Sequence, residues 1–158
     1  MSAQMIFDHV QLGALISYFD GTLRPGKDDH AELARWHSRN GSGRLVRKWP
    51  EPHIGDLSIP ASFTLERDPP GPDHLATFRV LRTFAVDSDL KFAVTERPPD
   101  GSVRILDRSG GDARLVHLAG CRADAESWLR ANGHPDVVLE EITADEAAAD
   151  VVEGRAAA

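Results

Sequence analysis

The chain has 158 residues, a formal net charge of −7 and 27% charged residues, which is ordinary for one globular domain with its own core. Its single cysteine, Cys121, excludes an internal disulfide framework, and the lack of any run of about 18 apolar residues excludes a membrane-spanning helix. The N-terminal residues lack the basic start and apolar stretch of a secretory signal, so we expect a cytoplasmic protein.

A strand and a helix are predicted in the first 41 residues. Residues 12–19 are apolar, partly β-branched or aromatic, and end at an Asp-Gly turn pair, as is typical of a strand. Residues 30–39 are expected to form a helix, because Asp29 is a good N-cap and the Asn-Gly pair at 40–41 is a common helix stop. Trp36 lies on the apolar stripe of this helix, so we expect its ring in the core.

Short strands dominate the middle of the chain. Alternating apolar residues mark each strand, and turn sequences such as Pro-Pro-Asp-Gly at 98–101 separate them. The expected strands are residues 43–49, 59–65, 77–86, 90–96, 103–106 and 114–118, with a proline-rich loop at 68–74. Short strands joined by tight turns predict an antiparallel meander.

The last third of the chain changes character. Residues 122–131 are predicted to be helical and to stop at a second Asn-Gly pair, and residues 137–142 are predicted to be a strand. Thr143 and Glu146 have the spacing of a capping box, which opens an alanine-rich acidic segment. This segment, residues 143–158, is expected to be a frayed helix or tail.

These elements predict an α+β fold. We expect one domain over residues 1–142, with a twisted antiparallel β-sheet of about six to eight strands and two or three helices packed on one side. A strongly curved meander can also close in part, as an SH3-like partial barrel.

One short motif resembles that of a known family. Residues 15–23 resemble the first motif of the haloacid-dehalogenase-like phosphohydrolases, in which an apolar strand leads into Asp-x-Asp-Gly-Thr. The resemblance implies a parallel Rossmann-like sheet and a nucleophilic aspartate at position 18. This chain has Tyr18 there, and a phenol cannot form the aspartyl-phosphate. We therefore assign no phosphohydrolase site and read the Asp-Gly pair as a turn.

The titratable residues form no recognisable catalytic or metal motif. His30 and His37 are separated by roughly 10 Å along the predicted helix, too far for one ion with ligand distances of about 2 Å. We predict no metal, no cofactor and no catalytic residue, and we expect Cys121 to be a buried small side chain. The alternative is a small metal-independent hydrolase or transferase that uses loop histidines and acids, with His74 or His117 as its base.

A basic segment stands out in this acidic chain. Residues 34–49 contain five Lys or Arg and no acid. If the strand at 43–49 is regular, Arg44 and Lys48 share one of its faces, and Trp49 can act as a stacking platform. The candidate binding residues are Arg35, Arg39, Arg44, Arg47, Lys48 and Trp49.

A local reversal of charge favours contact with something negatively charged. The sequence therefore predicts a non-enzymatic binding module that contacts a nucleic acid or an acidic protein through a basic helix-strand surface. Two alternatives stay open: the hydrolase or transferase described above, and an assembly or regulatory subunit that docks through its acidic tail. The prediction requires the basic side chains to share one exposed surface.

Overall fold

The computed structural model describes residues 1–51, 53–54, 57–67, 79–133 and 136–146. Within these ranges the chain forms three helices and ten strands. The helices are α1 (Ala3–His9), α2 (His30–Arg39) and α3 (Arg122–Asn132). The strands are β1 (Leu15–Phe19), β2 (Gly41–Trp49), β3 (His53–Ile54), β4 (Leu57–Ser58), β5 (Ser62–Arg67), β6 (Val80–Ala85), β7 (Lys91–Glu96), β8 (Val103–Leu106), β9 (Leu115–Ala119) and β10 (Val138–Glu141).

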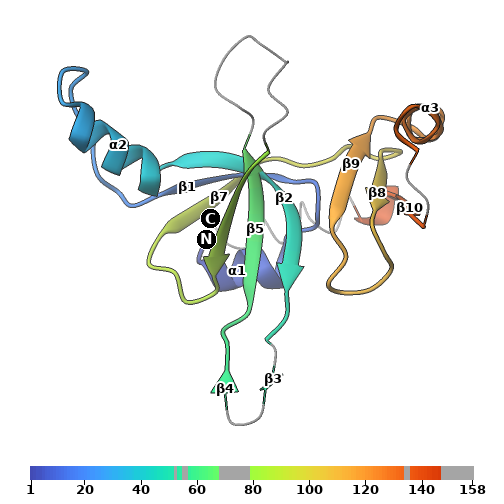
Figure 1. Ribbon diagram of the computed structural model, residues 1–158, viewed down its shortest axis with the longest axis horizontal. Coiled ribbons are helices and arrows are strands. Elements are labelled where there is room, and N and C mark those ends of the chain that lie inside the picture. The colour runs from blue at the N-terminus through green and yellow to red at the C-terminus, as the bar shows by residue number, and fades with distance from the viewer. Residues whose placement is uncertain (52, 55–56, 68–78, 134–135, 147–158) are drawn as a thin grey trace.

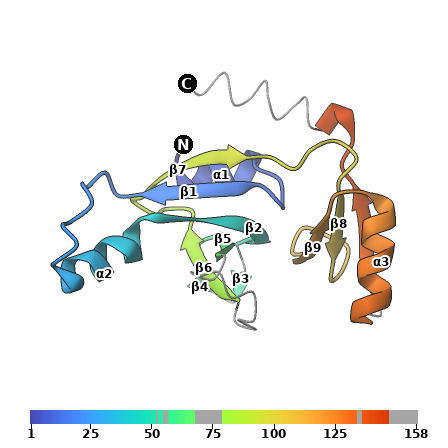
Figure 2. The same ribbon diagram turned by 90° about the horizontal axis from the view of Figure 1, so that it is seen from above.

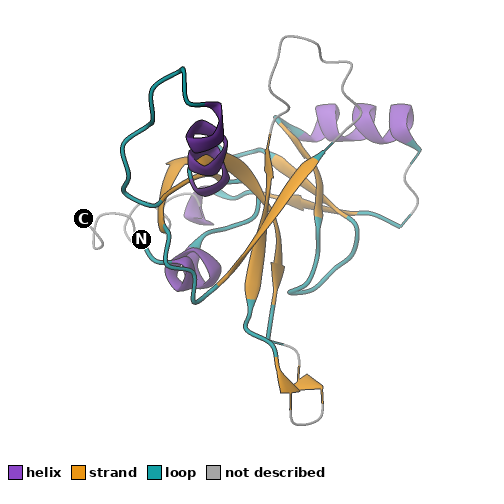
Figure 3. Cartoon of the chain, turned by 60° about the vertical axis from the view of Figure 1, so that its left-hand side comes forward, coloured by secondary structure: helices purple, strands orange, loops and turns teal. Residues whose placement is uncertain are grey.

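The strands form two antiparallel sheets rather than one, so the α+β class is confirmed and the expected single sheet is wrong. The larger sheet has the order β6-β5-β2-β1-β7, and the smaller has the order β10-β8-β9. The two sheets lie beside each other along the long axis of the molecule (Figures 1 and 2). Because β6 and β7 are both edge strands, the larger sheet does not close into a barrel. A two-stranded ribbon, β3–β4, extends away from both sheets (Figure 3).

The main core lies on one face of the larger sheet, under α1. Helix α1 buries Ala3 and Ile6 in this core. The centre of the core is aromatic, with neighbouring ring centroids 4.8 to 5.7 Å apart. Tilted and edge-to-face rings at such distances are favoured by the ring quadrupole. The four rings belong to Tyr18, Phe63, Phe84 and Phe92.

The three helices lie in three separate places, which differs from the expected packing on one side. Helix α1 contacts β7, whereas α3 contacts β8 and β9 of the smaller sheet. Helix α2 has no buried residue and projects from the opposite end of the molecule from α3 (Figures 1 and 2). The predicted N-cap of α2 is confirmed, because the Asp29 carboxylate accepts a hydrogen bond from the Glu32 amide. The prediction that Trp36 is a core residue is wrong; its Nε1 donates to the carbonyl of Thr22 at the surface.

A β-bulge in β2 joins the two sheets. The pairing of β2 with β5 changes register between Leu45 and Arg47, so Val46 is the extra residue of β2. The side chain of Val46 packs against apolar residues of β8 and β9, in a second core cluster. Directly after the bulge, Arg47 forms an isolated antiparallel bridge with Arg114, at the start of β9. The second half of β2 therefore serves as the seam between the sheets.

Arg104 makes a second connection between the sheets. Its side chain is 3% exposed and comes from β8. Its Nε donates to the carbonyl of Leu12 at 2.8 Å, in the segment before β1. Its two terminal nitrogens contact Glu140 at 2.9 Å and Glu146 at 2.6 Å. A buried guanidinium with three such acceptors fixes the smaller sheet, and the residues after it, to the larger sheet.

We expect Arg104→Met to lower the free energy of unfolding by about 3 kcal/mol, because the substitution leaves Glu140 and Glu146 without their buried partner. Urea denaturation at neutral pH measures this. The matched control is Arg108→Met, which removes an exposed ion pair and should change stability by less than about 0.5 kcal/mol. Equal stability of the two variants would contradict the role of Arg104.

Candidate functional site

The six predicted binding residues divide into three groups. Arg35 and Arg39 lie on α2, at one end of the molecule. Arg44, Arg47 and Trp49 are opposite Glu66, Thr64 and Ser62 of β5, so they share the face of the larger sheet that is turned away from α1. Lys48 is opposite the core residue Phe63, and its Nζ lies 5.7 Å from the ring centre of Phe7 in α1.

The prediction that Arg44 and Lys48 share a face is wrong, and the bulge is the reason. An unbroken strand alternates its side chains, so residues 44 and 48 would point the same way. The extra residue Val46 reverses the alternation after Leu45. The strand therefore presents Arg44, Arg47 and Trp49 together and turns Lys48 to the other side.

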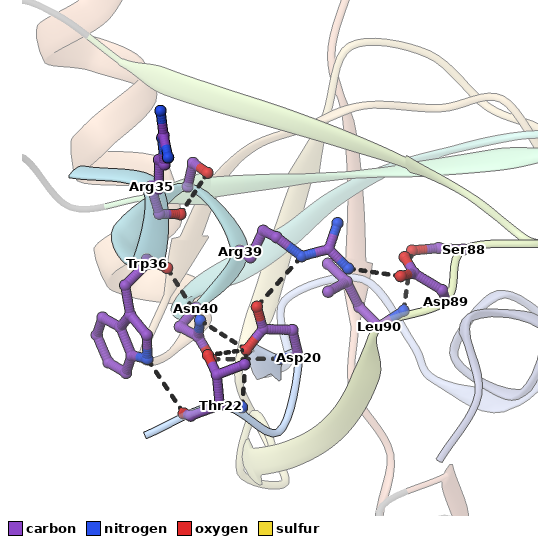
Figure 4. A network of polar contacts seen from close by, with 10 residues as sticks. Asp20, Thr22, Arg35, Trp36, Arg39, Asn40, Ser88, Asp89 and Leu90 are labelled. Carbon is purple, nitrogen blue, oxygen red and sulfur yellow. Dashed lines mark hydrogen bonds and ion pairs between the residues drawn. The ribbon is translucent and has the colours of Figure 1, made fainter. Parts of the chain in front are cut away.

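The two arginines of α2 have different surroundings. Arg39 contacts Asp20 at 3.2 Å and Asp89 at 2.5 Å, so its guanidinium joins α2 to the ends of two strand segments (Figure 4). Arg35 is exposed, and its carbonyl accepts a hydrogen bond from the Ser38 hydroxyl. Arg39 thus has a structural role at the base of α2.

Asp20 is the centre of this polar network. Its carboxylate accepts hydrogen bonds from the amide and hydroxyl of Thr22, from the side-chain amide of Asn40 and from Arg39 (Figure 4). These bonds, those from Thr22 above all, lower the pKa of Asp20 to about 2. Residues 20–22 therefore form a hydrogen-bonded turn after β1. The antiparallel sheet and the buried Tyr18 agree with the absence of a phosphohydrolase site there.

The face that carries Arg44 and Arg47 borders a hollow between the two sheets. The first part of this hollow has a volume of about 250 Å³, and Val46 and residues of β9 contribute to its lining. Two arginines stand at its rim. Arg44 donates to the Gly13 carbonyl at 2.5 Å and lies 3.8 Å from Glu96. Arg79 lies 3.5 Å from Glu66 and donates to the Val116 carbonyl at 3.4 Å. The lining residues are Arg44, Val46, Glu66, Arg79, Leu115, Val116, His117 and Leu118.

A second hollow adjoins the first at Val46 and has a volume of about 190 Å³. Here the Arg47 guanidinium lies over the Trp49 ring, 3.5 Å from its centre, and 4.0 Å from the Asp112 carboxylate. The buried Nε of Arg47 has no hydrogen-bond partner among the described residues. The lining residues are Val46, Arg47, Trp49, Thr64, Leu81, Thr83 and Arg114. We refer to the two hollows together as the sheet groove.

The alternative prediction, a hydrolase or transferase, requires a histidine hydrogen-bonded to a carboxylate. The described part of the chain shows no such pair. His117 lines the sheet groove, but its ring stacks flat on Trp128, at 4.9 Å and 5°. Burial and the nearby Arg79 lower the pKa of His117, and no carboxylate among the described residues hydrogen-bonds to it. Residues 1–51, 53–54, 57–67, 79–133 and 136–146 also contain no cluster of metal-ligating side chains. His74 lies outside these ranges.

Two further expectations concern the last third of the chain. Cys121 is exposed at the start of α3, so the prediction that it is buried is wrong. One of the two bonds of the expected capping box is present, since the Thr143 hydroxyl accepts a hydrogen bond from the Glu146 amide, whereas the Glu146 carboxylate contacts Arg104. The first turn of the acidic tail is therefore docked through Glu146 on Arg104, whereas residues 147–158 lie outside the described residues.

Comparison with known proteins identifies a family. The model of the family described as "Uncharacterised conserved protein UCP036055" matches residues 1–146, so the chain belongs to this family. No curated protein and no solved structure matches the chain. The match includes every described element of both sheets and the whole sheet groove. No helix of the described chain is long and apolar enough to cross a membrane.

The hydrogen bonds to Asp20 predict a defined acid dependence. The pKa of Asp20 is about 2 in the folded chain, against 3.8 for an ordinary carboxyl, so ionised Asp20 stabilises the fold. This contribution is complete above about pH 4 and is lost as the pH falls towards 2. An NMR titration of the Asp20 carboxyl carbon should give a midpoint near 2, and Thr22→Val should raise it. A wild-type midpoint near 4 would show that the network is absent in solution.

Proposed function

We propose that the protein is a non-enzymatic binding module that holds a negatively charged partner in the sheet groove. The proposal depends on one observation, the bulge at Val46, which turns Arg44, Arg47 and Trp49 to a single face. Arg79 and Arg114, from other parts of the chain, line the same groove. Among the described residues that line the groove, the four arginines are accompanied by one carboxylate, that of Glu66.

The ion pairs of the groove arginines with carboxylates are long, although Arg44 also donates a 2.5 Å hydrogen bond to the Gly13 carbonyl. Their contacts with carboxylates measure 3.8 Å for Arg44, 4.0 Å for Arg47 and 3.5 Å for Arg79. A strong charge-assisted bond between nitrogen and oxygen has a length of about 2.7 to 2.9 Å. Exchanging such long contacts for a carboxylate of a partner therefore costs little. By contrast, the two ion pairs of Arg104 measure 2.9 and 2.6 Å, in the range of a strong bond.

Of the two partner classes expected from the sequence, an acidic protein suits the groove better than a nucleic acid. Glu66 interrupts the row of arginines, so the groove offers no continuous row of cations for the successive phosphates of a nucleic acid backbone. The Arg47 guanidinium also covers one face of the Trp49 ring, which leaves that face closed to a stacked base. Apolar side chains of the groove, such as Leu81, offer contacts that a polypeptide can match.

Charge-matched double variants test the proposal. We expect Arg47→Gln with Arg114→Gln to weaken the binding of a fluorescently labelled glutamate-rich peptide about tenfold, which corresponds to roughly 1.4 kcal/mol. The control, Arg35→Gln with Lys48→Gln, removes the same charge outside the groove and should change the affinity less than twofold. Fluorescence anisotropy at low salt measures both.

Two results would contradict the proposal. One is equal weakening by the two double variants, which would show that only overall charge matters. The other is tighter binding of a single-stranded oligonucleotide of the same charge than of the peptide, which would favour a nucleic acid as partner. Thermal unfolding of each variant checks that the fold is retained.

A further inference from the structure

The two edges of the larger sheet differ in how they are covered. At the β7 edge, Met1 and Phe92 exchange two backbone hydrogen bonds, so the N-terminal residue protects part of that strand. Strand β6, at the other edge, pairs with β5 alone among the described residues. An uncovered edge presents unpaired amide and carbonyl groups that can pair with another strand.

The register shows which groups of β6 face outward. The amide of Val86 donates to the carbonyl of Ala61, so these two residues form a hydrogen-bonded pair. Because such pairs alternate along an antiparallel ladder, Phe84 and Arg82 also bond to β5. The residues between them face the other way: Leu81 and Thr83 direct their amides and carbonyls away from β5, and Ala85 directs its amide away, while its carbonyl accepts a hydrogen bond from the Ser88 amide at 3.0 Å.

The same edge is unusually apolar at its start. Val80 is 44% exposed and Leu81 is 47% exposed. Edge strands in natural proteins are commonly protected by charged side chains, proline or a bulge; β6 has one charged residue, Arg82, and neither a proline nor a bulge. Leu81 and Thr83 also line the sheet groove, so the edge is continuous with the groove.

Positive charge flanks this edge on both faces of the sheet. Arg79 lies on the groove face, where it contacts Glu66. Arg82 lies on the opposite face, where it donates to the Tyr18 hydroxyl at 3.3 Å and covers that ring. A strand added beside β6 would therefore have a guanidinium near each of its faces. Alternating acidic and apolar side chains complement this pattern of charge and exposed apolar surface.

We propose that β6 receives an extended acidic segment of a partner protein as an additional β-strand. This inference rests on the proposed function and specifies how the partner is held. Backbone hydrogen bonds to residues 81, 83 and 85 hold the partner strand beside β6, and the nearby arginines favour a strand with acidic side chains. A second copy of the chain is a poorer occupant. Pairing of β6 with its symmetric equivalent brings Arg79 and Arg82 of both copies into one ribbon, where like charges repel.

Hydrogen exchange gives a direct test with a peptide of alternating glutamate and valine. On binding, the amides of Leu81, Thr83 and Ala85 should gain protection, while those of Arg82 and Phe84, already bonded to β5, should change little. A peptide of alternating lysine and valine should not bind. Protection of the edge amides that appears without peptide and rises with protein concentration would indicate self-association and overturn the proposal.

A proline variant supplies a second, independent measurement. Thr83→Pro removes one outward amide without breaking a backbone bond to β5, so we expect at least a tenfold loss of peptide affinity. Thr83→Ala measures separately what is lost with the side chain, which lines the groove and hydrogen-bonds to Thr64. Strand addition requires a clearly larger loss of affinity in Thr83→Pro than in Thr83→Ala, and equal losses in the two variants would overturn it. If the proline variant does not fold, two N-methylated peptides test the same bonds. One is methylated at its odd-numbered amides and the other at its even-numbered amides. Only the peptide whose β6-facing amides are methylated should fail to bind.

The outcomes separate this inference from the proposed function. If the peptide binds and depends on Arg47 and Arg114, but the β6 amides gain no protection, the groove is a binding site and strand addition is wrong. If the glutamate-valine peptide does not bind at all, both proposals fail together.

Discussion

The β-bulge at Val46 is the constraint on which the rest of the structure depends. One extra residue reverses the alternation of β2. Directly after it, Arg47 bridges Arg114, the residue before β9, and Val46 itself lies in the core of the smaller sheet. The bulge also turns the side chains of Arg47 and Trp49 to the face that borders both sheets. Without the bulge, Lys48 would take that face and Arg47 would point towards α1.

The arginines of this chain serve two different purposes, and ion-pair geometry distinguishes them. Arg39 and Arg104 each contact two carboxylates, with pairs as short as 2.5 and 2.6 Å, and each joins segments that are distant in sequence. Those two side chains hold the fold together. The arginines of the sheet groove have long contacts of 3.5 to 4.0 Å with carboxylates. Contacts of this length lie outside the range of a strong charge-assisted hydrogen bond.

The description of the family to which the chain belongs names no activity, and the surface of the molecule carries the evidence on binding. The sheet groove and the β6 edge are parts of one continuous surface, because Leu81 and Thr83 belong to both. A polypeptide can use the two parts together, with its backbone on the edge and its acidic side chains towards the arginines. His117, which also lines the groove, stacks on Trp128.

Features that depend on residues close together in the chain could be predicted from the sequence. The sequence predicted the antiparallel α+β class, the extent of α2 with its Asp29 cap, and the cap at Thr143, because these depend on neighbouring residues. It also located the basic segment that supplies Arg44, Arg47 and Trp49. Only the tertiary structure decided the division into two sheets, the exposure of α2 and the grouping of arginines. Those features depend on where β2 bulges and on the bridge between Arg47 and Arg114, two residues too distant in sequence for any local pattern to reveal their pairing.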